Sequence, residues 1–244
     1  MRLAAHQPAH LPWLGYLHKV ARADVFVYLD AVQFEKNSYT NRNRIKTPQG
    51  PLWLTVPVKA RGHLDASLMT LAIDDVQPWR AKHLKSVEAN YRKAPHFEAC
   101  FPRLQALLAK PEPEASYAEF GWRELQFWLA EFGIGTRLLR QSQLAPTGAK
   151  SDLVLDLCRQ FGADHYLSGA LGRDYLRLDD FAAAGIAVEF QQFAHPVYPQ
   201  RWGAFESHLS VLDFWMNCGP DAARAIGAMA EAAATTPPAE PAHA

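Results

Sequence analysis

The chain has 244 residues, of which 49% are hydrophobic and 11% aromatic, and this is enough to bury the core of one folded domain. Its 25 Lys and Arg balance 25 Asp and Glu, so no overall field would attract nucleic acid or an anionic membrane. We therefore expect no nucleic-acid partner, and we expect any anion site to be local.

The cysteines and the N-terminal segment indicate a cellular compartment. Cys100, Cys158 and Cys218 are widely spaced and lack a CxxC pattern, which favours a reducing compartment over a disulfide framework. The segment before His6 lacks the apolar core of a signal peptide, and no stretch approaches the roughly 20 apolar residues that span a bilayer. We expect a cytoplasmic protein without membrane insertion.

A strand, a helix and a second strand are predicted at the start of the chain. Residues 3–5 are apolar, Pro12 suits the first turn of a helix, and apolar residues recur at helical spacing over 14–22. Residues 25–29 are typical of a buried strand. This order favours a parallel pair with a right-handed crossover, and ligands of such sheets lie at the carboxyl ends of the strands.

The rest of the chain predicts a helical segment followed by renewed alternation of strands and helices. Apolar spacing over about 78–133 indicates a helical layer or insertion in the middle third. Later strands are expected near residues 136–140, 165–168 and 186–191, and helices near 151–161 and 179–184. The predicted fold class is α/β, with a mainly parallel, Rossmann-like sheet.

One α/β domain is expected over residues 1–230. From residue 231 the composition turns to Ala, Thr, Pro and Glu, which cannot bury enough apolar surface to offset the entropy of ordering. Residues 231–244 are therefore predicted to be a disordered tail.

Residues 41–50 combine cations and amides at close spacing. Arg42, Arg44 and Lys46 supply donors suited to carboxylate or phosphate oxygens, and Asn41 and Asn43 lie between them. The same pattern is typical of a solvated β-hairpin with its turn at 48–50. The two interpretations are compatible if one face of the hairpin lines a cleft.

Histidines precede the predicted first helix, where backbone N–H groups favour an anion. His6, Gln7 and His10 resemble the phosphate site of nucleotidylyl-transferring α/β enzymes, but the glycine usual between the two histidines is missing. Zinc bound through His6, His10 and His18 would need a fourth ligand that the spacing does not supply. We expect no metal.

Two later segments are also candidate ligand contacts. Ser168 and Gly169 follow a predicted strand, and Arg173 and Asp174 complete a loop that could bring N–H groups close to an anion, although a structural turn is the alternative. The rigid stretch 195–200 carries a His and a Tyr that could act as acid, base or substrate contacts, although a lone His there is more often structural.

Several of these segments together resemble the WbqC-like protein family, from about residue 3 to about residue 220. The matching segments are HQP at 6–8, LPWLGY at 11–16, NRNRIK at 41–46, WLTVPV at 53–58, GRDYL at 172–176 and HPVYPQ at 195–200. The family is associated with bacterial surface-polysaccharide loci, including O-antigen clusters. A remote similarity to pantothenate synthetase includes Gln33-Phe34. In that enzyme the matching Gln-Phe pair touches a small hydroxy acid beside ATP.

The resemblance implies a glycan-synthesis setting, and an anion-binding cleft is consistent with acyl or aminoacyl transfer to an amino sugar or nucleotide sugar. A nucleotide or acyl-CoA cofactor is compatible with this hypothesis. Two alternatives stay open: a nucleotide-dependent ligase or nucleotidyltransferase that activates a carboxylate, and a non-catalytic glycan-assembly partner. The predicted catalytic residues are His6 and His195. The predicted substrate-binding residues are Gln7, Asp30, Gln33, Asn41, Arg42, Asn43, Arg44, Lys46, Ser168, Gly169, Arg173, Asp174 and Tyr198.

Overall fold

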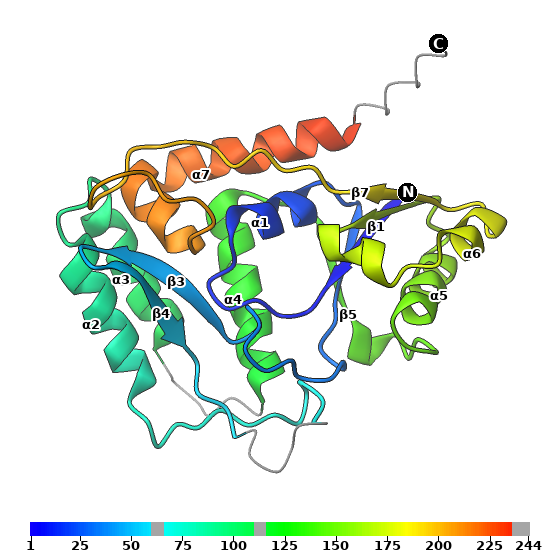
Figure 1. Cartoon of the computed structure of the whole chain (residues 1–244), viewed down its shortest axis with the longest axis horizontal. Coiled ribbons are helices and arrows are strands. Elements are labelled where there is room, and N and C mark those ends of the chain that lie inside the picture. The colour runs from blue at the N-terminus through cyan, green and yellow to red at the C-terminus, as the bar shows by residue number, and fades with distance from the viewer. Residues whose placement is uncertain (60–65, 110–115, 236–244) are drawn as a thin grey trace.

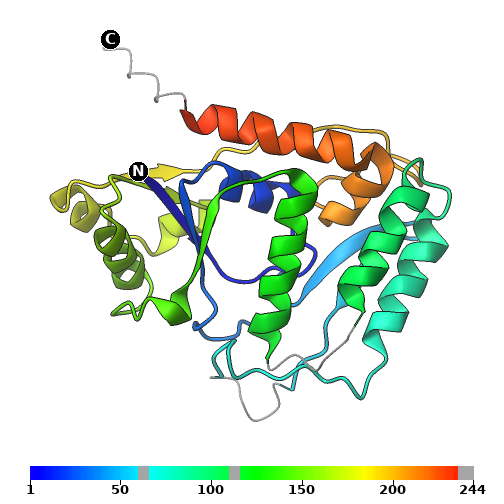
Figure 2. The same cartoon turned by 180° about the vertical axis from the view of Figure 1, so that it is seen from behind.

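The computed structural model describes residues 1–59, 66–109 and 116–235, with side chains described to residue 225. Its centre is a five-stranded sheet in which every neighbouring pair is parallel. The strands are β1 (Arg2–His6), β2 (Val25–Tyr28), β5 (Arg137–Arg140), β6 (His165–Ser168) and β7 (Ala187–Phe190). Helices lie around this sheet (Figures 1 and 2), so the predicted α/β class with a mainly parallel sheet is confirmed. The comparison with a Rossmann sheet stays a prediction.

Alternating side chains of the central strands feed two hydrophobic cores. Leu3 of β1 and Val25 of β2 point to the face covered by α5 (Ser151–Phe161) and α6 (Leu178–Ala183). Ala4 and Phe26 point to the opposite core, which holds most of the remaining helices. The strands are therefore apolar on both sides, as parallel strands covered by helices require.

The order of the strands reverses between β1 and β6. Along the sheet the order is β5-β2-β1-β6-β7, so the chain first adds β2 and β5 on one side of β1 and then β6 and β7 on the other. Open parallel sheets bind ligands outside the carboxyl ends of the strands at such a reversal. A ligand site is therefore expected at the carboxyl ends of β1 and β6.

The predicted middle helices are confirmed, and so is a hairpin in the preceding segment. The hairpin is β3 (Arg42–Thr47) paired antiparallel with β4 (Gly50–Thr55), and the helices are α2 (Trp79–Tyr91), α3 (Phe97–Leu108) and α4 (Tyr117–Phe132). Helix α1 (Leu14–Ala21) joins β1 to β2, and the 3-10 turns η1 (Gln141–Gln143) and η2 (Ala170–Asp174) follow β5 and β6.

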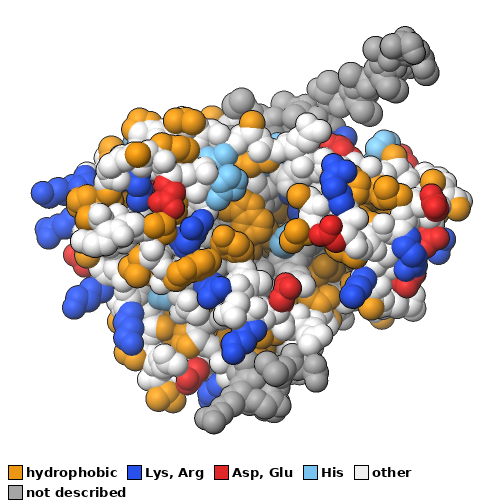
Figure 3. Space-filling model, viewed as in Figure 1, with side chains coloured by type: hydrophobic (Ala, Val, Ile, Leu, Met, Phe, Trp, Pro, Cys, Tyr) orange, Lys and Arg blue, Asp and Glu red, His pale blue; other side chains and the backbone are white. Residues whose placement is uncertain are grey.

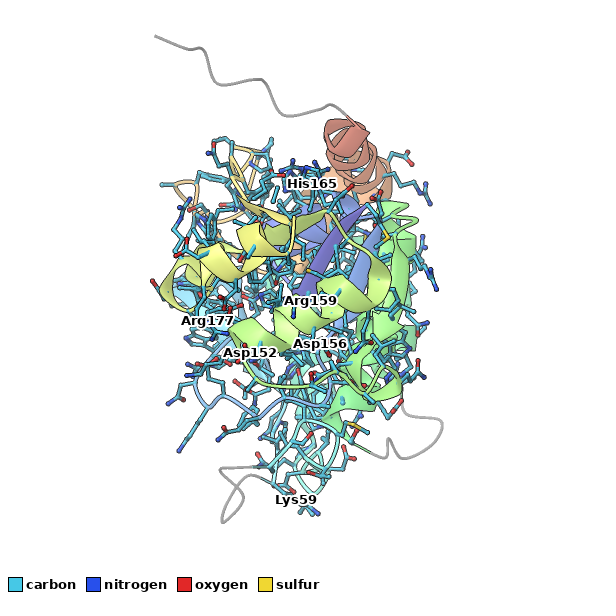
Figure 4. All side chains as sticks on the ribbon, turned by 90° about the vertical axis from the view of Figure 1, so that its right-hand side faces the viewer. Lys59, Asp152, Asp156, Arg159, His165 and Arg177 are labelled. Atoms are coloured by element: carbon cyan, nitrogen blue, oxygen red, sulfur yellow. The ribbon has the colours of Figure 1, made fainter. Side chains whose placement is uncertain are left out.

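The sheet face opposite α1 is closed by α5 and α6, whose charged side chains lie outside. Figure 4 looks onto this side and shows Asp152, Asp156 and Arg159 along α5. Arg177, just before α6, pairs with Asp152 and with Asp180. These exposed ion pairs connect the start of α5 with the start of α6, and each is expected to add little stability.

A last helix, α7 (Val211–Thr235), was not predicted from the sequence. It packs on α1, α3 and α4 and runs along one edge of the molecule (Figure 1). Gly219 interrupts it with φ 86°, and a Cβ there would lie 2.5 Å from the His96 ring, so only glycine fits this kink. Of the predicted tail, residues 231–235 continue α7, and 236–244 lie outside the described residues.

Among the residues that the structure describes, no helix combines the length and the apolar character needed to cross a bilayer.

Candidate functional site

The loop at residues 7–13, between β1 and α1, is held by distant parts of the chain. The buried Glu124 of α4 accepts from Leu11 N at 2.7 Å and pairs with His10 Nδ1 at 3.0 Å. Asn43 of β3 donates from Nδ2 to the Leu11 carbonyl at 2.6 Å. Leu11 itself has φ 44°, a strained value for a branched residue. His10 and Asn43 therefore shape the loop, and the loop is a rigid platform beside the strand ends.

His6 ends β1 and is packed among aromatic rings. Its ring centroid lies 4.9 Å from that of Tyr16 and 5.8 Å from that of Trp13, and its Nδ1 is 2.9 Å from the Gln7 carbonyl. Burial and, secondarily, the charge of Lys19 lower the pKa of His6 to about 3. The imidazole is therefore neutral at pH 7 and can accept a proton or a hydrogen bond.

Lys19 of α1 is a buried cation at the same place, and the sequence did not identify it. Its side chain reaches β1, where Nζ donates to the Ala5 carbonyl at 3.1 Å. Among the described residues no carboxylate forms an ion pair with it, and burial lowers its pKa to about 7. One signal was present in the sequence, because Lys19 lies between Leu17 and Val20 in a helix of mostly apolar residues.

The loop after β6 lies next to β1, as its position at a strand end predicted. Ser168 is buried and its Oγ donates to the Gly169 carbonyl at 3.0 Å. Arg173 stacks on Phe190 at the end of β7, with Cζ 4.1 Å from the ring centroid, and Asp174 is exposed. The loop therefore places the guanidinium of Arg173 beside the carboxyl end of β7.

Three aromatic residues extend from His6 toward the hairpin, and we call them the aromatic wall. They are Trp13, Tyr39 and Trp53, with ring centroids 5.7 Å apart for the first pair and 5.6 Å apart for the second. Tyr39 and Trp53 are 39% and 40% exposed, which is high for large rings. Figure 3 shows one face of the molecule hollowed in the middle, with hydrophobic side chains in the hollow and Lys, Arg and His as well as acidic side chains around it.

Arg42 and Arg44 add positive charge to the aromatic wall. Their Cζ atoms lie 4.4 Å and 5.6 Å from the Trp53 ring centroid. Arg42 also donates to the Asn37 carbonyl at 2.6 Å, and Arg44 is 3.9 Å from Glu206. Both guanidinium groups therefore combine a stacking face with N–H donors, a combination that suits a phosphorylated ring compound.

Asp30 lies at the end of β2 but has no free oxygen. It accepts from Arg140 Nε at 2.7 Å and from both the N–H and the hydroxyl of Ser142, at 2.8 Å and 2.7 Å. The carboxylate is completely buried. These contacts join β2 to the segment after β5, so the structure gives Asp30 a visible structural role.

Lys46 and Tyr198 lie in a second buried cluster around Asp213 of α7, which we call the Asp213 network. Asp213 accepts from Tyr91 OH at 2.7 Å, Tyr198 OH at 2.9 Å and Gln200 Nε2 at 2.7 Å. Lys46 Nζ donates to Gln200 Oε1 at 2.9 Å and to the Ala204 carbonyl. Burial raises the pKa of Asp213. The described hydrogen bonds of Lys46 and Tyr198 therefore connect them to this network.

Gln7, Asn41 and Gln33 each contact a different part of the chain. Gln7 Oε1 accepts from Thr40 at 3.4 Å, and Asn41 donates to the Val56 carbonyl at 2.8 Å. Gln33 is exposed and forms an isolated bridge with Ser67.

His195 follows β7 and packs among Phe193, Tyr198 and His208. It is half-buried, its ring centroid is 5.2 Å from that of His208, and burial lowers its pKa. Phe193 connects it to the start of α1, since a Cβ at Gly15 would lie 3.0 Å from the Phe193 ring.

The structure thus places His6, Gln7, Ser168 and Gly169 at or just beyond the carboxyl ends of the neighbouring strands β1 and β6, and it places Arg42 and Arg44 at the aromatic wall. It places Asp30, Lys46 and Tyr198 in internal networks. Within the described ranges, no group of three or more His, Cys, Asp or Glu residues is arranged to hold a metal ion.

Comparisons with known proteins identify a matching family and a similar protein. The model of the WbqC-like protein family matches residues 7–225. The Uncharacterized protein Rv1507c of Mycobacterium tuberculosis is 32% identical over 222 residues, which cover 91% of this chain and 95% of that protein. No solved structure matches.

Proposed function

The chain belongs to the WbqC-like protein family, and on that premise we propose that it transfers an acyl or aminoacyl group to an amino sugar or nucleotide sugar. The proposed setting is the cytoplasmic synthesis of a bacterial surface polysaccharide. The family supplies the setting, and the site supplies the class of ligand.

The aromatic wall is the observation that carries the proposal. Exposed rings can stack on the apolar faces of sugars and on nucleotide bases, and a contiguous group of apolar side chains on a surface indicates an interaction site. Trp53 carries Arg42 on its ring, so stacking and phosphate recognition occur at one place. The wall leads from these cations through Trp13 to His6, so a ligand bound along it would reach the strand ends.

His6 is the proposed proton acceptor. The amine nitrogen of the sugar attacks the acyl carbonyl carbon, a C–N bond forms, and the bond to the leaving group breaks. The proton lost by the amine passes to the neutral imidazole of His6. The low pKa of His6 in the empty site limits its strength as a base, and the negative charge of a bound phosphate would raise that pKa. His195 is proposed as a further substrate contact.

A thermal-shift screen tests the class of ligand. The panel contains ATP, CoA, acetyl-CoA, UDP-sugars and dTDP-sugars, with Arg44→Ala as the site variant and exposed Arg92→Ala as the matched control. A ligand at 100 times its Kd adds about 2.7 kcal/mol of stability. We expect a nucleotide sugar to raise the Tm of the wild type and of Arg92→Ala but not of Arg44→Ala. Equal shifts in all three proteins would contradict the proposed site.

The carboxylate-activating ligase is kept as a second candidate because the site lies where a parallel sheet reverses its strand order. Release of pyrophosphate from ATP in the presence of a carboxylate would select it. Consumption of acyl-CoA without ATP would select acyl transfer. The absence of turnover with both donors, together with capture of an assembly protein, would select the non-catalytic partner.

A further inference from the structure

Lys19 carries a buried charge that lacks a counter-ion. The residue is 3% exposed, and of the three N–H donors of its ammonium only one has a described acceptor, the Ala5 carbonyl at 3.1 Å. No Asp or Glu within residues 1–59, 66–109 and 116–225 forms an ion pair with it. An isolated ammonium is costly to bury, and proteins rarely retain one without a partner.

The ammonium lies where β1 and β6 separate. Their pairing runs from Arg2 with His165 to Ala4 with Leu167 and stops there, although β1 continues to His6 and β6 to Ser168. The His6 carbonyl is bonded from the β2 side by Leu29 N, so the Ala5 carbonyl faces β6. It accepts from Lys19 instead, at the reversal of strand order where open parallel sheets bind ligands.

Gly169 leaves open space beside the ammonium. A Cβ built on Gly169 would meet only one atom within 4 Å, Lys19 Nζ at 3.9 Å. The backbone of Gly169 has φ −72° and ψ 169°, which any residue adopts, so its conformation does not require glycine. The missing side chain therefore leaves room for another group next to Nζ, and an oxyanion would provide the absent charge.

We propose that Lys19 and Gly169 form a phosphate subsite at the opening between β1 and β6. A phosphate oxygen lies against Lys19 Nζ in the space left by Gly169 and supplies the counter-ion that the protein lacks. Lysine binds phosphate as a point charge, and glycine allows the backbone to approach it closely. The inference rests on the proposed function in taking the ligand to be a nucleotide sugar, whose diphosphate would carry this group while its rings lie on the aromatic wall.

Two variants test the Lys19 ammonium and the space beside Gly169 independently. Lys19→Met removes the ammonium and keeps an apolar stem of similar length. Gly169→Ala keeps the ammonium and fills the space, at a contact distance that needs no rearrangement. Lys82→Met on the exposed surface of α2 is the matched control. Calorimetry with pyrophosphate, UDP and malonate measures binding, and thermal melting without ligand measures folding.

We expect the wild type and Lys82→Met to bind pyrophosphate and UDP, and both subsite variants to bind them at least about tenfold more weakly, a loss of about 1.4 kcal/mol. Gly169→Ala is expected to melt like the wild type, so it tests the subsite even if Lys19→Met fails to fold. Unchanged pyrophosphate binding in Gly169→Ala and in any folded Lys19→Met would overturn the subsite. Binding of malonate but not pyrophosphate would also overturn it, because the ligand group would then be a carboxylate.

The outcomes also separate the subsite from the proposed function. Loss of pyrophosphate binding in the variants, with no acyl transfer to any nucleotide sugar, supports the subsite and removes the transfer reaction. Binding of a UDP-sugar that depends on Arg44 but not on Lys19 or Gly169 keeps the proposed function and removes the subsite. If pyrophosphate binds neither the wild type nor the control, the phosphate subsite is wrong.

Discussion

Lys19 and Asp213 are both buried charges, yet their surroundings are opposite. Asp213 accepts hydrogen bonds from Tyr91, Tyr198 and Gln200, which come from widely separated parts of the chain. Lys19 has one carbonyl and no carboxylate among the described residues. Buried polar groups in stable proteins have partners, so a complete set indicates a structural role and an incomplete set points to a missing ligand. The Asp213 network therefore has the contacts of a structural element, whereas the surroundings of Lys19 are those expected of the proposed phosphate subsite.

The largest expected effect is on the Asp213 network. Asp213→Ala leaves two phenol groups and an amide without their shared acceptor, and we expect the free energy of unfolding to fall by about 3 to 5 kcal/mol. Urea unfolding measures it, with Asp221→Ala as the control because that side chain is fully exposed. A loss below about 1 kcal/mol would show that the network is not what holds α7 in place.

A change of opposite sign is expected at Lys19. Lys19→Met removes an unpaired buried charge, so we expect the ligand-free protein to gain about 2 kcal/mol at pH 7, or roughly 4 to 8 °C in Tm. The pKa of Lys19 is lowered from 10.5 to about 7, so between these values the unfolded chain binds more protons than the folded one. The free energy of unfolding of the wild type therefore rises with pH between about 7 and 10.5, and the stability advantage of Lys19→Met over the wild type becomes smaller. A variant less stable than the wild type at pH 7 would contradict the unpaired charge.

A smaller effect is expected from His6 in acid. Its pKa falls from 6.5 in the unfolded chain to about 3 in the folded protein, so stability from the neutral imidazole is lost as pH drops from 6.5 toward 3. We expect His6→Gln to lose about 1 kcal/mol less than the wild type between pH 6.5 and pH 5. His208→Gln, at an exposed position without a carboxylate partner among the described residues, is the control and should follow the wild-type curve. Identical acid profiles for all three proteins would show that His6 is not held neutral.

The smallest expected effect on stability is at Arg44. Its ion pair with Glu206 is 3.9 Å long and partly exposed on both sides, so Arg44→Ala should change the free energy of unfolding by less than about 0.5 kcal/mol. Melting without ligand measures it. A large loss in the free energy of unfolding would show that Arg44, like the Asp213 network, stabilises the fold. Arg44→Ala would then be a poor probe of binding.

Much of the fold could be predicted because local periodicity decides it. The short apolar runs at 3–5 and 25–29 and the helical spacing at 151–161 are present in the residues themselves. The helix α7 could not be predicted in the same way. Val211, Leu212, Trp215 and their neighbours are buried on all sides, so no polar face marks a helical period. Gly219-Pro220 then resembles a break between elements.

The site shows a similar division. His6 and Ser168 were expected at strand ends because parallel strands present their carboxyl ends at one edge, and the structure places them there. Lys19 was missed because a lysine in an amphipathic helix is normally assigned to solvent. The partners of Tyr198 and Lys46 were also hidden from the sequence, since Asp213 belongs to the unpredicted helix.

The attachment of Leu11 has a consequence for how the protein folds. Its carbonyl is bonded by Asn43, 32 residues away, and its N–H by Glu124, 113 residues away. Closing such long loops is entropically slow, and contacts of this kind form late in folding. The strand that carries His6 can therefore pair with β2 early, while the loop beside it acquires its shape only after α4 has docked. A nascent or truncated chain that ends before residue 124 would contain both His6 and Lys19 without the platform that makes them a site.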